Sequence, residues 1–110
     1  MGDGLEAFRR GRFYQARELW EADGLIARDP ERGWIKGLAE IAAGFLRCDE
    51  NALSSAQRLI FKGLHRLQGA PPLVGGIRIG DVRHAGAVLL EALRSGQPAN
   101  LRSLVERAAS

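Results

Sequence analysis

The sequence has almost no cysteine and no long apolar run, and each absence excludes a class of protein. Cys48 is the only cysteine among the 110 residues, so an internal disulfide is excluded and a reducing compartment is favoured. No apolar run approaches the roughly 18–20 residues that a membrane-spanning helix needs. The first residues, Met1 to Glu6, lack the basic and apolar segments of a signal peptide. We therefore expect a cytoplasmic protein that makes no membrane contact.

Runs of alternating polar and apolar residues, which would indicate β-strands, are also missing. The apolar residues instead recur at helical spacing almost throughout. With 110 residues the chain is the size of one domain, so we predict a single domain over residues 1–110. The short connections between the predicted helices favour an all-α fold, a compact antiparallel bundle of five to six helices.

Glycine, proline and capping residues divide the chain into these helices. The spacing predicts a short first helix ending near Gly11, helices over about 12–28, 30–47 and 51–67, a fifth one carrying residues 82–93, and a short last one carrying residues 101–108. Asp29 and Asp81 are the expected N-caps of the third and fifth helices. Residues 68–80 are too rich in glycine and proline for a continuous helix but carry four aliphatic side chains. We expect that segment to be irregular and packed on the bundle.

The predicted core consists of large apolar residues at helical spacing, with small residues beside them. The expected central residues are Trp20, Trp34, Leu38, Phe45, Ile60 and Leu64. The third helix also contains Gly37, Ala39, Ala43 and Gly44. Because a glycine inside a helix costs about 1 kcal/mol relative to alanine, we expect a neighbouring helix to approach this helix closely.

The segment from Gly11 to Glu21 reads Gly-Arg-Phe-Tyr-Gln-Ala-Arg-Glu-Leu-Trp-Glu. It resembles the opening motif of a bacterial and archaeal family catalogued as domain of unknown function number 309, in which a glycine, two aromatics and an acid precede Ala-His-Glu and a later tryptophan. Residues 37–43, residues 51–67 and the dipeptide at 76–77 are similar to later blocks of that family, so the resemblance extends over about 8–93. It implies a compact helical bundle. Arg17 stands at the position of the family's histidine, and a permanently charged guanidinium cannot replace an imidazole in proton transfer.

The most prominent polar feature is a group of charges on the second and third predicted helices. Arg17 and Glu21 are four residues apart, as are Lys36 and Glu40, so each pair shares a helix face. If these helices pack antiparallel, the four side chains and Glu18 meet in one groove. Two interpretations stay open. The group is either a salt-bridge network that fixes the helix register or a polar pocket that binds a small anion or a charged side chain of a partner.

Side chains suited to catalysis or metal binding are scarce. The Cys48 thiol stands beside Asp49 and Glu50, which should raise its pKa rather than activate it. No Glu-x-x-His motif is present, and Asp81 with His84 is a weak ligand pair. We therefore assign no catalytic residue, no metal site and no cofactor, and lean against an enzyme.

The net charge of +3 comes from 16 basic and 13 acidic residues scattered along the chain. Nucleic-acid-binding proteins usually gather basic residues on one face, so a nucleic-acid accessory function is the least favoured hypothesis. We favour a non-enzymatic interaction or scaffold module that binds a partner protein or self-associates, for instance as a homodimer. The alternative is a small-ligand-binding protein or enzyme that uses a groove between Glu18 and Glu40.

Overall fold

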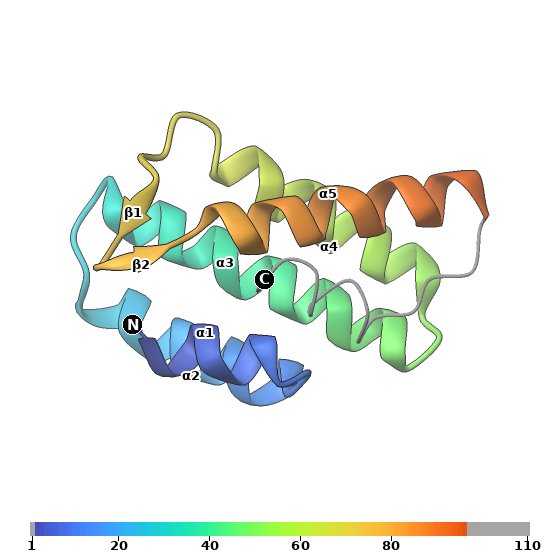
Figure 1. Ribbon diagram of the computed structural model, residues 1–110, viewed down its shortest axis with the longest axis horizontal. Coiled ribbons are helices and arrows are strands. Elements are labelled where there is room, and N and C mark those ends of the chain that lie inside the picture. Colours follow the sequence, from blue (N-terminus) through green and yellow to red (C-terminus); the bar gives the residue numbers. More distant parts are fainter. Residues whose placement is uncertain (1, 97–110) are drawn as a thin grey trace.

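The computed structural model describes residues 2–96 of the chain, and within this range the protein is an all-α bundle with one minimal β-hairpin (Figure 1). The helices and strands in chain order are α1 (Gly2–Arg9), α2 (Phe13–Ile26), α3 (Glu31–Asp49), α4 (Leu53–Arg66), β1 (Leu73–Val74), β2 (Ile77–Arg78) and α5 (Gly80–Ser95). The predicted all-α fold is confirmed. The predicted last helix, over 101–108, lies outside the described residues.

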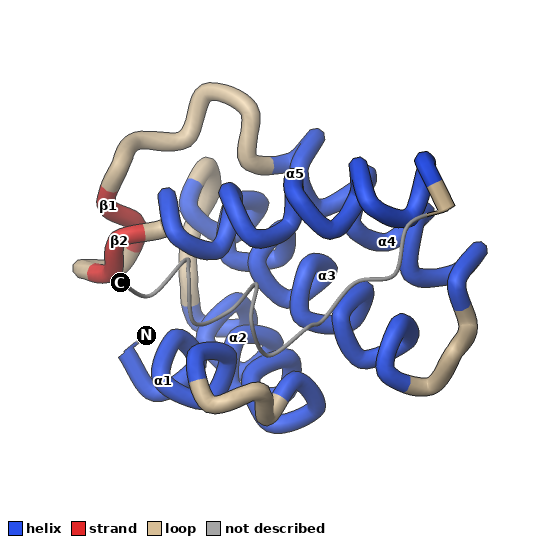
Figure 2. Tube along the Cα trace, turned by 45° about the vertical axis from the view of Figure 1, so that its right-hand side comes forward, coloured by secondary structure: helices blue, strands red, loops and turns tan. Residues whose placement is uncertain are grey.

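Helix α3 is the central element of the bundle. It packs most extensively on α4 and on α2, while α1 packs on α2 and α5 packs on α4 and α3. Short connections at residues 27–30 and 50–52 fold α3 back on α2 and α4 back on α3. In Figure 2, α1 and α2 lie on one side of α3, and α5 and α4 lie on the other. None of the helices within residues 2–96 has the length and apolar character needed to cross a membrane.

The helix boundaries agree with the predicted ones to within a few residues, but the two predicted aspartate caps are wrong. Pro30, not Asp29, precedes the first residue of α3, and its carbonyl accepts hydrogen bonds from the backbone N–H groups of Gly33 and Trp34. Helix α5 begins at Gly80, so Asp81 lies inside its first turn. The carboxylate of Asp81 there contacts Arg9 of α1 at 3.1 Å and caps nothing.

The segment before α5 contains a hairpin that the sequence patterning did not predict. Strands β1 and β2 pair antiparallel, with Val74 opposite Ile77. Gly75 and Gly76 connect them with φ angles of 56° and 80°, the left-handed conformation that a two-residue hairpin turn requires. The expected packing on the bundle is confirmed for Val74, Ile77 and Ile79, which are buried, whereas Leu73 is exposed.

The core forms where α1, α2, α4 and α5 meet α3. Trp20, Leu38, Phe45 and Ile60 are fully buried, as predicted. An aromatic cluster links α1, α2 and α3 through ring contacts, and it consists of Phe8, Phe13, Trp20 and Phe45.

Two residues predicted at the centre of the core lie at its margin instead. Trp34 and Leu64 are only partly buried. Trp34 stands in the first turn and a half of α3, near one end of the bundle. Leu64 flanks the stripe of α4 that faces α3, and it points toward Gly86 of α5. Helical spacing identified both as apolar positions but could not rank their depth.

The close helix approach expected from the small residues of α3 is present between α3 and α4. A Cβ atom added to Gly37 would lie 2.9 Å from the carbonyl oxygen of Gly63, and one added to Gly63 would lie 2.6 Å from that of Gly37. The two glycines therefore allow the backbones to touch. Ala39 and Ala43 lie on another face of α3, and that face leads to the site described next.

Candidate functional site

A groove runs over α3 between α2 and α4, and we call it the basic groove. Its volume is about 630 Å³. Helices α2 and α3 supply most of its lining, and α4 contributes one residue. The lining residues are Arg17, Glu21, Gly24, Leu25, Arg32, Lys36, Ala39, Glu40, Ala43, Arg47 and Leu59.

Helical geometry explains why these residues meet. Arg17, Glu21 and Leu25 recur every four residues along α2, as do Arg32 and Lys36 along α3, so each set occupies one side of its helix. Antiparallel packing of α2 on α3 then turns the two sides toward the same groove.

The apolar part of the groove combines a small-residue floor with one exposed and one partly buried leucine. Ala39 and Ala43 are almost fully buried. Their small side chains leave a depression on the surface of α3 between α2 and α4. Leu25 stands at the end of α2 with 81% of its surface exposed. Leu59 of α4 completes the apolar lining. The groove therefore offers both apolar surface and charge.

Four of the five charged residues singled out in the sequence lie at this groove. Arg17, Glu21, Lys36 and Glu40 all line it. Glu18 does not, because it projects from a neighbouring side of α2. There it accepts a hydrogen bond from Tyr14, and this bond and the negative charge of Glu18 raise the pKa of Tyr14. The geometry thus separates Glu18 from Glu40, the pair that the alternative function would have used together.

The carboxylate of Glu40 is already engaged by two cations from α4. Arg66 Nε donates to its Oε1 at 2.5 Å, and Lys62 Nζ lies 3.6 Å from its Oε2. Only 12% of the Glu40 side chain is exposed. Helical spacing had indicated Lys36 as the neighbour of Glu40 and neither of these partners on α4. Counting outward from the α3–α4 turn near Asn51 would have found one of them, since residues 40 and 62 are equidistant from it in an antiparallel pair.

Glu21 also has a partner within its own helix. Arg17 Nε lies 3.6 Å from its Oε1, which confirms the predicted proximity of these two residues. The Arg17 guanidinium also lies over the Tyr14 ring, 5.1 Å from its centroid, in the range of a cation–π contact. Arg17 is therefore held between a carboxylate and an aromatic ring.

The remaining cations of the groove have capacity for further ligands. Lys36 is exposed and forms no ion pair with any residue within 2–96. Arg32 donates through Nε to the carbonyl oxygen of Ala27 at 2.9 Å, and Arg47 pairs with Glu50 at 2.7 Å. An arginine has five N–H donors, so both guanidinium groups keep further donors. With its two carboxylates already engaged, the groove has a positive character.

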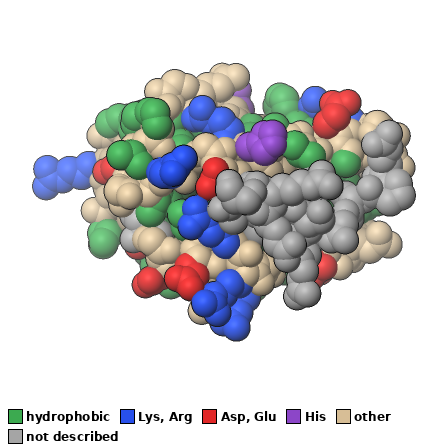
Figure 3. Space-filling view, viewed as in Figure 1, with side chains coloured by type: hydrophobic (Ala, Val, Ile, Leu, Met, Phe, Trp, Pro, Cys, Tyr) green, Lys and Arg blue, Asp and Glu red, His purple; other side chains and the backbone are tan. Residues whose placement is uncertain are grey.

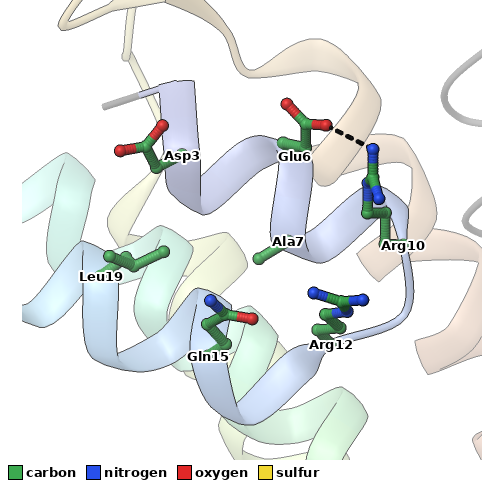
Figure 4. Close-up of a pocket in the computed structure, with 7 residues that line it drawn as sticks. All are labelled: Asp3, Glu6, Ala7, Arg10, Arg12, Gln15 and Leu19. Atoms are coloured by element: carbon green, nitrogen blue, oxygen red, sulfur yellow. Dashed lines mark ion pairs between the residues drawn. The ribbon is translucent and has the colours of Figure 1, made fainter.

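A second pocket, of about 430 Å³, lies between α1 and α2 (Figure 4). Asp3 and Glu6 of α1, and Arg10 just after its end, reach it from one side, with Arg12 and Gln15 on the other side. Glu6 and Arg10 form an exposed ion pair at 2.9 Å, of the kind that contributes little to stability. The apolar lining of this pocket is limited to Ala7 and Leu19, and its charged residues are all exposed.

The other candidate groups, Cys48, Asp81 and His84, do not line the groove. The pKa of Cys48 is raised, as predicted, but burial is the largest cause and the charge of Asp49 is second, whereas the sequence had pointed to Asp49 and Glu50. Within residues 2–96, no group of three or more His, Cys, Asp and Glu side chains is placed to hold a metal ion. On the face shown in Figure 3, the visible Lys and Arg side chains are interspersed with Asp and Glu.

Comparison with known proteins identifies a family but no relative of known activity. No curated protein and no solved structure is significantly similar to the chain. A family model does match, over residues 1–59, and this range includes the motif from Gly11 to Glu21 and the block at 37–43 but not the dipeptide at 76–77. The match covers just over half of the chain, which therefore belongs to the family described as Domain of unknown function (DUF309).

Proposed function

We propose that the protein is a non-enzymatic interaction module that binds a partner protein in the basic groove. The observation that supports this most directly is the contrast among the groove's charges. Glu21 and Glu40 have cationic partners within the molecule, whereas Lys36 has none among the described residues. An exposed cation and an exposed leucine, Leu25, in the same groove offer charge recognition together with apolar burial.

The chemistry of the groove favours binding over catalysis. A general base must be within reach of the proton that it removes, and the oxygens of Glu40 are already occupied by Arg66 and Lys62. The resemblance places Arg17 where the family motif is expected to carry a histidine, and a guanidinium does not transfer protons near neutral pH. Binding needs only the free donors and the apolar lining.

A photo-crosslinking residue at position 25 tests this proposal in a lysate of the source organism. We expect a specific adduct from position 25 that disappears when Lys36→Glu is also present. Position 26 provides a matched control, because Ile26 is as exposed as Leu25 but does not line the groove. Equal adducts from both positions, or adducts that persist with Lys36→Glu, would contradict the proposal.

A small amphipathic anion is a second candidate ligand, favoured by one observation. The groove volume of about 630 Å³ lies within the range of small-molecule sites. Native mass spectrometry of the purified protein separates the possibilities. A bound small molecule adds mass to the monomer, self-association doubles the mass, and a separate partner protein leaves the bare monomer.

A further inference from the structure

We propose that the segment that binds the basic groove is an amphipathic α-helix of a partner protein, with acidic side chains flanking an apolar stripe. This inference rests on the proposed function and specifies the partner's chemistry. It depends on the length of the groove, the nature of its walls and the distribution of its charges.

The groove is long and shallow. Arg32 and Arg47 both line it, and because they are 15 positions apart on α3, it extends over about 22 Å, or four helical turns. A volume of about 630 Å³ over that length accommodates the side chains on one face of a bound peptide segment but not the whole segment. A compact small molecule would contact only a fraction of the groove, whereas a helix of about four turns would contact all of it.

The walls of the groove exclude two other ways of binding a peptide. Strand addition needs a sheet edge with unpaired backbone groups, but the walls are the helices α2 and α4, whose backbone groups bond within each helix. Recognition of a proline-rich segment needs aromatic side chains along the groove, and its lining includes none. An apolar helix face laid between two helices fits these walls, and the small side chains of Ala39 and Ala43 allow it to approach α3 closely.

The positive charges of the groove favour acidic side chains on the partner helix. Arg32 and Arg47 mark its two ends, and Lys36 and Arg17 lie between them. The apolar side chains of Leu25, Ala39 and Leu59 would contact the stripe between the partner's acids. A second copy of this chain is a poorer match, because its net charge of +3 opposes the groove's own sign.

The test is a selection from displayed segments of about 16 residues of unrestricted sequence, long enough to form the four helical turns that the groove accommodates. The library has randomised positions on every face, and the bait is the full chain. Selected segments are then synthesised, and their affinities are measured by fluorescence anisotropy. The bait variants are Leu25→Glu and Lys36→Glu in the groove, with Ile26→Glu and Arg78→Glu as matched controls. All four residues are exposed, so the substitutions should leave folding intact.

We expect groove-dependent binders to have apolar residues at helical spacing and an excess of Asp and Glu. Their affinity should fall at least tenfold with each groove variant and stay within about twofold with each control. Their circular dichroism should show helix formation on binding. Selection of no groove-dependent segment overturns the inference, as does selection of basic, proline-rich or extended ones.

The two proposals can fail separately. If crosslinking at position 25 captures a partner that depends on Lys36 but contacts the groove through an extended segment, the helix inference is wrong and the proposed function stands. If positions 25 and 26 give equal adducts, or if the adduct persists with Lys36→Glu, the proposed function itself is wrong.

Discussion

The contact between Gly37 and Gly63 makes a quantitative prediction about the stability of the bundle. In Gly63→Ala the new methyl carbon would lie 2.6 Å from the Gly37 carbonyl oxygen and 2.8 Å from Cγ1 of Ile41. The isoleucine can turn away, but the carbonyl belongs to the backbone of α3 and cannot. Helices α3 and α4 must therefore separate by several tenths of an ångström along their most extensive contact.

The magnitude follows from two opposing terms. Alanine favours the helical state of α4 by about 1 kcal/mol relative to glycine. Overpacking in a core costs about 1–3 kcal/mol and more where backbone must move. We expect Gly63→Ala to lower the free energy of unfolding by about 2 kcal/mol, which for a chain of this size lowers Tm by about 10 °C.

Urea denaturation followed by tryptophan fluorescence measures this change, since Trp20 is fully buried and reports on loss of the core. Gly33→Ala is the matched control. A Cβ atom added to Gly33 would have no neighbour within 4 Å, so this substitution should leave stability unchanged or raise it by up to about 1 kcal/mol. If Gly63→Ala proves as stable as Gly33→Ala, the close approach of α3 and α4 is incorrect.

Three further predictions concern ionisable groups. Glu40→Gln should lower the free energy of unfolding by about 1–2 kcal/mol, because a mostly buried carboxylate loses its charged hydrogen bond. Lys62→Ala should lower it by about 0.5 kcal/mol or less, because this lysine is exposed. Equal losses for the two variants in urea denaturation would contradict this order. Glu18→Gln should lower the pKa of Tyr14, because Glu18 is the largest cause of its raised value, and an ultraviolet absorbance titration that shows no change would refute that contact. Cys48 should react with iodoacetamide more slowly than free cysteine at mildly alkaline pH, because its raised pKa leaves less thiolate, and a rate equal to that of the free amino acid would contradict its burial.

The sequence was sufficient to predict the helices because their signals are local. Apolar residues at steps of three and four, ended by residues such as Gly11, give the bounds of α2, α3 and α4 to within a few residues. The hairpin escaped because each of its strands has two residues, too few to alternate visibly. Its one local signal was Gly75-Gly76 between the aliphatic residues Val74 and Ile77, a pattern typical of a two-residue turn.

The candidate site was harder to predict, because spacing within a helix shows which residues share a face but not which residues they contact on another helix. The spacing correctly brought Arg17 and Glu21 together. It also suggested a pair between Lys36 and Glu40, whereas Glu40 turns to α4. Which of two cations neutralises a carboxylate depends on the rotation of each helix about its axis, and a single helix pattern does not contain that rotation.

The two interpretations of the charged cluster now separate residue by residue. Glu40 ties α3 to α4 through Arg66 and Lys62, as expected of a network that fixes helix register. That contact has a consequence for binding, because it occupies the acid that would otherwise neutralise Lys36. Removing Glu40 should therefore weaken the bundle, whereas removing Lys36 should leave the bundle intact and weaken only the binding of an acidic partner. The salt bridges of Glu40 stabilise the bundle and leave Lys36 without an acidic partner among the described residues. The proposed binding site uses this positive charge, so a structural network and a binding site can occupy the same groove.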